Sequence, residues 1–203
     1  MEVNRFVNSI FNSNTYVLYQ NEENDVWVID PGSSFNELID WIEKKGKSLK
    51  GIFLTHSHFD HIYGINDLQD KFSDVIIYAS LFAKEGLLSE KLNGSLYMEI
   101  PFVLKKQCIN IVKEGDLIFL WKNIILKVIE TPGHDRDCIS FLVNENLFTG
   151  DALIPGIKVH TKLKYSNKKL AEESINRILN EFDNKTIIWP GHEDKCLLID
   201  LKS

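Results

Sequence analysis

Three of the six histidines in this chain lie in one short stretch, THSHFDH, which covers residues 55–61. Residues two apart in an extended segment point the same way, so His56 and His58 can converge on one ion. The chain must then turn, which presents Asp60 and His61 at the start of the next helix. Imidazole nitrogens and carboxylates are ligands of divalent transition metals. Two close ligand sets on one loop favour two neighbouring ions over one.

Three more potential ligands follow strands, each directly after a glycine, which permits the sharp turn that releases a strand into a loop. They are His134, Asp151 and His192, in the segments TPGHD (131–135), FTGDA (148–152) and WPGHE (189–193). Each of these side chains taken alone is equally compatible with an ordinary turn residue. Together with the first loop they put five of the six histidines at strand ends, which predicts a common metal site.

The elements that must position these residues are short and alternate irregularly. Apolar, β-branched runs predict strands over 15–19, 25–30, 51–55, 74–79, 117–121, 123–131, 138–143, 147–150 and 186–190. Helical patterns occupy 34–46, 60–72, 80–92 and 166–182, the first with Ser34 as N-cap and Glu37 three residues later. Because several strands are adjacent in sequence, the pattern indicates an α/β fold with partly antiparallel sheets.

Composition limits the classes of partner. The length of 203 residues predicts a single domain over 1–203, and 29 acidic against 23 basic residues give a net charge of −6. An acidic surface disfavours nucleic acid as a partner. The cysteines at 108, 138 and 196 form no CxxC pair, so neither a disulfide framework nor a thiolate zinc site is expected. Without a signal-peptide core or a membrane-length apolar run, we expect a cytoplasmic protein with no membrane partner.

Five motifs occur in the order typical of one family: VIDPG (28–32), THSHFDH (55–61), TPGH (131–134), LFTGDAL (147–153) and PGHE (190–193). On these motifs the sequence resembles the metallo-β-lactamase superfamily, and within it the glyoxalase II-like (hydroxyacylglutathione hydrolase-like) hydrolases. The resemblance implies an αβ/βα four-layer sandwich, with two mixed β-sheets, helices on the outer faces and the site at one edge.

The resemblance also implies a ligand set. One metal ion would be held by His56, His58 and His134, the other by Asp60, His61 and His192, and Asp151 would bridge both. Asp60 and Asp151 would be the catalytic carboxylates. Asp30 matches an aspartate of the family that supports the site without binding metal.

The activity so implied is that of a dinuclear metal-dependent hydrolase, in which a hydroxide that bridges the metals attacks the carbonyl of an ester, thioester or lactone. Nitrogen and oxygen ligands favour zinc, while iron and manganese accept the same set. A mononuclear iron persulfide dioxygenase-like enzyme and a non-catalytic metal-binding member are the alternatives. The presence of His61 and His192 favours two metals and hydrolysis. The sequence leaves the small-molecule substrate and the oligomeric state open.

Two segments outside the motifs are candidates for substrate binding. The first covers 93–102 and contains Tyr97; the second covers 156–165 and contains Lys158, His160, Lys162, Lys164 and Tyr165. In a β-like stretch the even-numbered residues of the second segment would share one cationic face, which would attract an anionic substrate. A packed loop and a solvated basic loop are the alternative interpretations.

Overall fold

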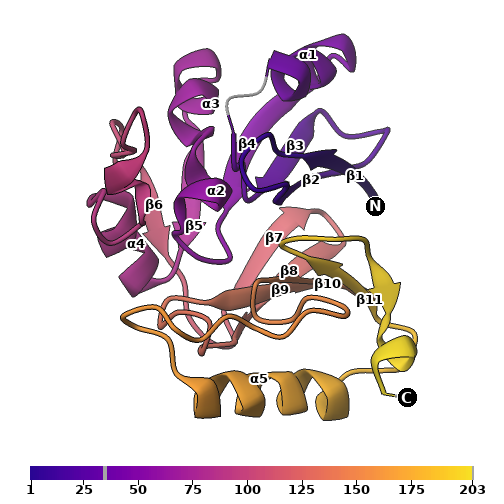
Figure 1. The fold of residues 1–203 in the computed structure, drawn as a ribbon. Helices are drawn as coiled ribbons and strands as arrows, with labels where there is room; N and C mark the ends of the chain where they lie inside the picture. The colour runs from indigo at the N-terminus through magenta and orange to yellow at the C-terminus, as the bar shows by residue number, and fades with distance from the viewer. Residues whose placement is uncertain (34–35, 203) are drawn as a thin grey trace. The chain divides into compact units, whose positions relative to one another are not determined.

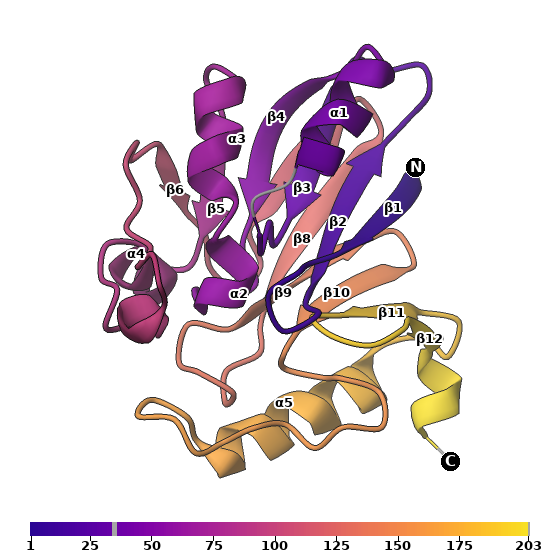
Figure 2. The ribbon, with the colours of Figure 1, turned by 45° about the horizontal axis from the view of Figure 1, so that its top comes forward.

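The computed structural model describes residues 1–33 and 36–202, so the predicted N-cap Ser34 lies outside the described residues. The chain forms two compact units, Met1–Ile111 and Val112–Ser203. Each unit contains its own six-stranded sheet, labelled in Figures 1 and 2.

The sheet of the first unit is mixed, with the strand order β1-β2-β3-β4-β5-β6. The pairs β1–β2 and β2–β3 are antiparallel, whereas β3–β4, β4–β5 and β5–β6 are parallel. The strands are β1 (Glu2–Val7), β2 (Asn14–Tyr19), β3 (Asp25–Ile29), β4 (Ser48–Phe53), β5 (Ile76–Ala79) and β6 (Ile109–Ile111).

Helices supply the other half of this unit's core. They are α1 (Asn36–Lys44), α2 (Phe59–Ile62), α3 (Ile65–Lys71) and α4 (Leu81–Leu87), with a short 3₁₀ turn, η1, at Ser95–Tyr97. The apolar faces of α1, α3 and α4 join the β-branched residues of the sheet in one cluster, which includes Leu38, Ile42, Ile65, Leu87, Val28 and Ile52.

The second unit has the strand order β12-β11-β10-β9-β8-β7 and is also mixed, because β10–β11 is parallel and the other pairs are antiparallel. Its strands are β7 (Leu117–Trp121), β8 (Ile124–Glu130), β9 (Ile139–Val143), β10 (Asn146–Gly150), β11 (Ile187–Pro190) and β12 (Cys196–Leu197). Helix α5 (Lys168–Glu181) runs along this sheet (Figure 1) and buries Ile178 against Ile129, Leu147 and Ile188. A last 3₁₀ turn, η2, covers Leu198–Leu201.

All nine predicted strands are present, as β2–β5 and β7–β11. The sequence analysis missed β1, β6 and β12, each of which is an edge strand of its sheet. The helix predicted over 60–72 is two helices, α2 and α3, that break at Gly64. The amide of Gly64 donates to Pro31 O, which lies outside the helix, and a Cβ on Gly64 would lie 2.2 Å from Ser33 O. This close contact with residues 31–33 accounts for the break at Gly64. None of the helices within 1–33 and 36–202 has the length and hydropathy needed to cross a bilayer.

One ion-pair network ties α5 to its sheet. The Arg177 guanidinium donates to both carboxylate oxygens of Glu114, at 2.8 and 3.0 Å, and to Glu181 at 3.0 Å. Glu114 also accepts from the amide of Glu130 at 2.7 Å. The hydrogen bond from Arg177 lowers the pKa of the Glu114 carboxyl, and the same contacts raise the pKa of Arg177.

Because the folded state lowers the pKa of Glu114, this carboxylate stabilises the fold above the ordinary value of 4.5, and the contribution disappears as pH falls through the lowered pKa. We therefore expect Glu114→Gln to reduce the free energy of unfolding at neutral pH, and the difference from wild type to vanish in acid. Urea denaturation at both pH values measures this. Glu173→Gln, an exposed glutamate on helix α5, is the control. An equal deficit at both pH values would contradict this electrostatic role.

Candidate metal centre

The first unit brings together the donors of the THSHFDH loop. His56 and His61 are fully buried, Asp60 is buried, and His58 is partly exposed. The ring centroid of His56 lies 4.7 Å from that of His58 and 4.2 Å from that of His61. Four ligand-type side chains from seven consecutive residues thus point into one small region, as the sequence predicts.

The local backbone explains this convergence. His58 is still extended, with φ −64° and ψ 144°, and α2 begins at the next residue, so Asp60 and His61 fall in its first turn. This turn is anchored by two hydrogen bonds: the amide of Phe59 donates to Asn93 O, and the hydroxyl of Ser13 donates to Asp60 O.

Asp30 lies directly behind these donors, buried at the end of β3. Its carboxylate accepts from the Thr55 amide at 2.8 Å and the Thr55 hydroxyl at 2.6 Å, and it lies 3.1 Å from Nδ1 of His61. A carboxylate oxygen only accepts, so Nδ1 of His61 carries the proton and Nε2 keeps the lone pair.

Thr55 extends this control to His56. Because its hydroxyl proton goes to Asp30, its oxygen is left to accept from Nδ1 of His56, which lies 3.0 Å away. The lone pair of His56 is then also on Nε2. Each of Asp30, His56 and His61 has one potential metal-ligand atom, and these three atoms all lie within 4.8 Å of one another.

The second unit holds the remaining donors at its strand ends. Asp151 follows β10, His134 follows β8, and His192 follows β11. Oδ2 of Asp151 lies 3.6 Å from Nε2 of His134 and 3.6 Å from Nε2 of His192. Nδ1 of His134 lies 3.0 Å from the backbone carbonyl of His160, which can only accept, so Nε2 again carries the lone pair.

These separations test whether the residues suit a metal ion. The Nε2–Oδ2 distances are 3.5 Å in the His61–Asp60 pair and 3.6 Å in the two pairs of Asp151. Such distances exceed those of a charge-assisted hydrogen bond. They approach the about 3.4 Å expected between two ligand atoms on one tetrahedral ion with bonds of about 2.1 Å. The donors of each unit therefore fit divalent transition metals.

The residues predicted to bind substrate differ in their exposure and in their contacts. Tyr97, on η1, is 93% exposed. In the second segment Lys158, His160, Lys162 and Lys164 are all exposed, but the predicted β-like stretch is wrong, because the structure has no strand at 158–165. Instead Tyr165 packs against cations: the guanidinium of Arg136 lies 4.1 Å from its ring centroid and the Lys164 ammonium 4.8 Å.

The sequence analysis missed three residues that hold the ligands in place. They are Ser13, Thr55 and Ser166, the last of which donates its hydroxyl to the backbone carbonyl of His134. Only Thr55 had a usable signal, its place beside His56. Burial of Cys138 raises the pKa of its thiol.

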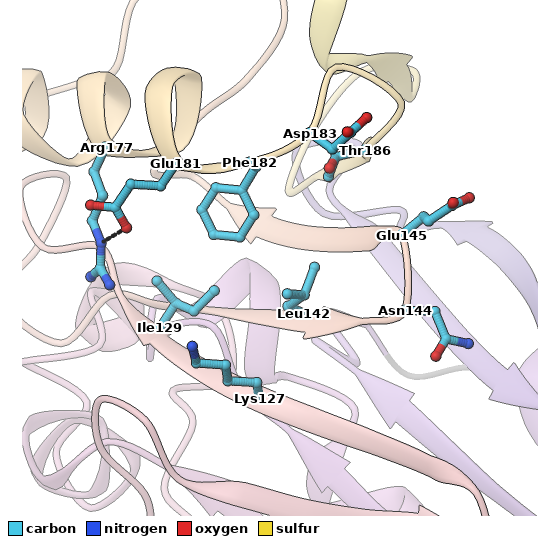
Figure 3. Close-up of a pocket in the computed structure, with 10 residues that line it drawn as sticks. All are labelled: Lys127, Ile129, Leu142, Asn144, Glu145, Arg177, Glu181, Phe182, Asp183 and Thr186. Atoms are coloured by element: carbon cyan, nitrogen blue, oxygen red, sulfur yellow. Dashed lines mark hydrogen bonds and ion pairs between the residues drawn. The ribbon is translucent and has the colours of Figure 1, made fainter.

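A pocket of about 350 Å³ lies elsewhere in the second unit, between the C-terminal half of α5 and strands β8 and β9 (Figure 3). Ile129, Leu142 and Phe182 form its apolar part, and the Arg177–Glu181 ion pair closes one end. It contains none of the predicted metal ligands.

Comparison with known proteins addresses the whole chain. The family model of the metallo-β-lactamase superfamily matches residues 9–192. A probable metallo-hydrolase of Streptococcus pyogenes is 32% identical over 197 residues, which are 95% of this chain and 84% of that protein. Hydroxyacylglutathione hydrolase 1 of Vibrio vulnificus is 31% identical over 188 residues, which are 91% of this chain and 64% of the relative. This chain thus spans less than two thirds of the length of the Vibrio enzyme.

Among solved structures, that of the B3 metallo-β-lactamase BLEG-1 matches with a TM-score of 0.89 and 27% sequence identity, and the match covers 97% of this chain and 94% of that one. The mixed sheets of both units and this likeness confirm the fold class predicted above. With the histidine and aspartate donors and the family match over both units, the chain belongs to the metallo-β-lactamase superfamily of metal-binding hydrolases.

Proposed function

We propose that this protein is a dinuclear metal-dependent hydrolase of an ester, thioester or lactone, with Asp151 as the ligand common to both ions. One observation carries the proposal: Oδ2 of Asp151 is 3.6 Å from Nε2 of both His134 and His192. The family pattern assigns these two histidines to different ions. A carboxylate oxygen at the same distance from both histidines supports a ligand shared by the two ions.

The remaining ligands would be His56 and His58 beside His134, and Asp60 and His61 beside His192. Two ions held in this way would supply Lewis acidity toward a carbonyl oxygen and a hydroxide nucleophile at neutral pH. All five histidines are neutral as ligands, and Asp60 and Asp151 contribute only two negative charges. The centre therefore keeps positive charge and can stabilise the negative charge that develops on the substrate oxygen.

Two observations support the proposed substrate class. Several relatives are hydroxyacylglutathione hydrolases, which supports a thioester or ester substrate. The exposed side chains of Lys158, His160, Lys162 and Lys164 make one loop of an acidic protein cationic, which supports a substrate that carries a carboxylate or phosphate. Zinc is the metal we favour, since imidazole and carboxylate ligands suit it.

The proposal predicts two metal ions per chain. Elemental analysis after removal of metal and reloading with zinc should reach about two ions, and His61→Ala or His192→Ala should reduce the content to about one. Saturation of the wild type at one ion, with both variants unaffected, would contradict the dinuclear model and favour a mononuclear iron oxygenase. The same analysis on protein as purified identifies the native metal.

Substitution of Asp151 should reduce metal affinity and hydrolysis more than substitution of any other single ligand. If its carboxylate serves both ions, Asp151→Ala should lose metal affinity and essentially all hydrolysis of a panel of thioesters, esters, lactones and β-lactams. Asp183→Ala, an exposed aspartate of the same unit, is the matched control. Hydrolysis by the Asp151→Ala variant at the wild-type rate would exclude the proposed mechanism.

The basic loop should affect charged substrates selectively. We expect Lys158→Ala and Lys162→Ala to raise KM several-fold for anionic esters or thioesters, with little change in kcat and little effect on neutral substrates. Exposed charges act mainly on encounter and are screened by salt, so the effect should shrink as ionic strength rises. Lys185→Ala, an exposed lysine in another loop, serves as control. Equal losses for neutral and anionic substrates would point to a structural role.

A further inference from the structure

We propose that residues 160–167, here called the ligand strap, hold the imidazole of His134 in its metal-binding orientation, with Tyr165 and Ser166 as positioning residues. The proposal rests on the role of His134 as a ligand in the proposed function. The strap itself contributes none of the predicted metal ligands.

Three hydrogen bonds run between the strap and the loop that carries His134. The ring Nδ1 of His134 donates to the carbonyl of His160 at 3.0 Å. The carbonyl of His134 accepts from the hydroxyl of Ser166 at 2.6 Å, and that of Gly133 accepts from the amide of Asn167 at 2.8 Å. The strap thus fixes both the ring and the main chain of the same ligand.

Ser166 is the central residue of this arrangement. While its hydroxyl donates to His134 O, the same oxygen accepts from the amide of Leu163 at 3.1 Å. The amide of Ser166 in turn donates to Leu163 O, which closes a tight turn. One hydroxyl therefore fixes the shape of the strap and fastens it to the ligand loop, and alanine at this position would lose both functions.

Tyr165 makes a second, independent attachment. The Arg136 guanidinium, two residues beyond His134, lies 4.1 Å from the ring centroid of Tyr165. Cations stack on aromatic rings through the ring quadrupole, and phenylalanine retains this interaction whereas leucine does not. The ring therefore attaches the strap to Arg136, a residue of this loop to which Ser166 makes no hydrogen bond.

Helix α5 holds the other side of the ligand loop. The hydroxyl of Ser174 donates to Pro132 O at 2.8 Å, and a Cβ on Gly133 would lie 2.2 Å from the amide nitrogen of Ala171. With the main chain pressed against α5, the carbonyl of His160 determines which way the imidazole turns. Partners that orient a ligating histidine typically change metal affinity by about 10–100-fold.

The test measures metal affinity and not turnover. Metal-free protein is titrated with Zn²⁺ against a chelating indicator, and with Co²⁺ followed by its visible absorption. We expect Ser166→Ala and Tyr165→Leu each to weaken binding of one ion by about tenfold and to alter the Co²⁺ spectrum. Ser166→Thr and Tyr165→Phe, which retain the hydroxyl and the ring, should bind as wild type does.

A stability control separates positioning from general loss of structure. Ser80→Ala removes the N-cap of α4, whose oxygen accepts from the amide of Ala83 at 3.1 Å, and should lower the melting temperature without changing metal affinity. If Ser80→Ala lowers the affinity for metal ions as much as Ser166→Ala does, the strap proposal is wrong. Should Ser166→Ala fail to fold, the comparison of Tyr165→Leu with Tyr165→Phe decides.

Failure of this proposal differs from failure of the proposed function. Wild-type affinity for both ions in Ser166→Ala and Tyr165→Leu, together with loss of one ion in His134→Ala, would overturn the strap and leave the hydrolase intact. Unchanged metal content in His134→Ala would instead remove His134 from the ligand set and overturn both.

Discussion

The orientation of the potential metal ligands in the first unit depends on the hydrogen bonds of one buried carboxylate, that of Asp30. Through Thr55 and His61 it determines the protonation of two imidazoles, and it does so at a backbone φ of +50°, a region that residues other than glycine rarely adopt. A buried carboxylate must be fully hydrogen-bonded to be tolerated. Here the groups that satisfy it are the same ones that aim the ligands, so the stability of this region and the geometry of the donors have one cause.

In the second unit, the orienting partner of a ligand histidine is not a carboxylate. There a backbone carbonyl, that of His160, sets the tautomer of His134, and a hydroxyl and an aromatic–cation contact hold the carbonyl in place. A carbonyl is a weaker acceptor than a carboxylate and carries no charge. The two units thus use acceptors of different strength, which tunes the electron-donating power of their imidazoles differently.

Most of the strands and all of the proposed metal ligands could be predicted from the sequence, because they depend on short local patterns. Strands such as β8 and β11 are rich in isoleucine and valine, and a ligand motif follows each of them. Both the type of these elements and the position of the ligands could therefore be predicted from the sequence. The strands β1, β6 and β12 were missed because none of them contains a fully buried residue, and β6 and β12 are only three and two residues long. The break at Gly64 depends on the approach of Pro31, a contact distant in sequence. For the same reason Ser13 and Ser166 could not be recognised as supports of the site.

The packing of Gly32 has a consequence for reading sequence variation in this region. A Cβ at this position would lie 1.7 Å from the carbonyl oxygen of Asp60, so the two backbones are in direct contact. Even a methyl group would displace the turn that presents Asp60 and His61. Gly32 is therefore expected to tolerate substitution as poorly as a ligand does, although it has no side chain with which to take part in chemistry. In a mutational scan, such a position would be mistaken for a catalytic residue unless protein abundance were measured beside activity.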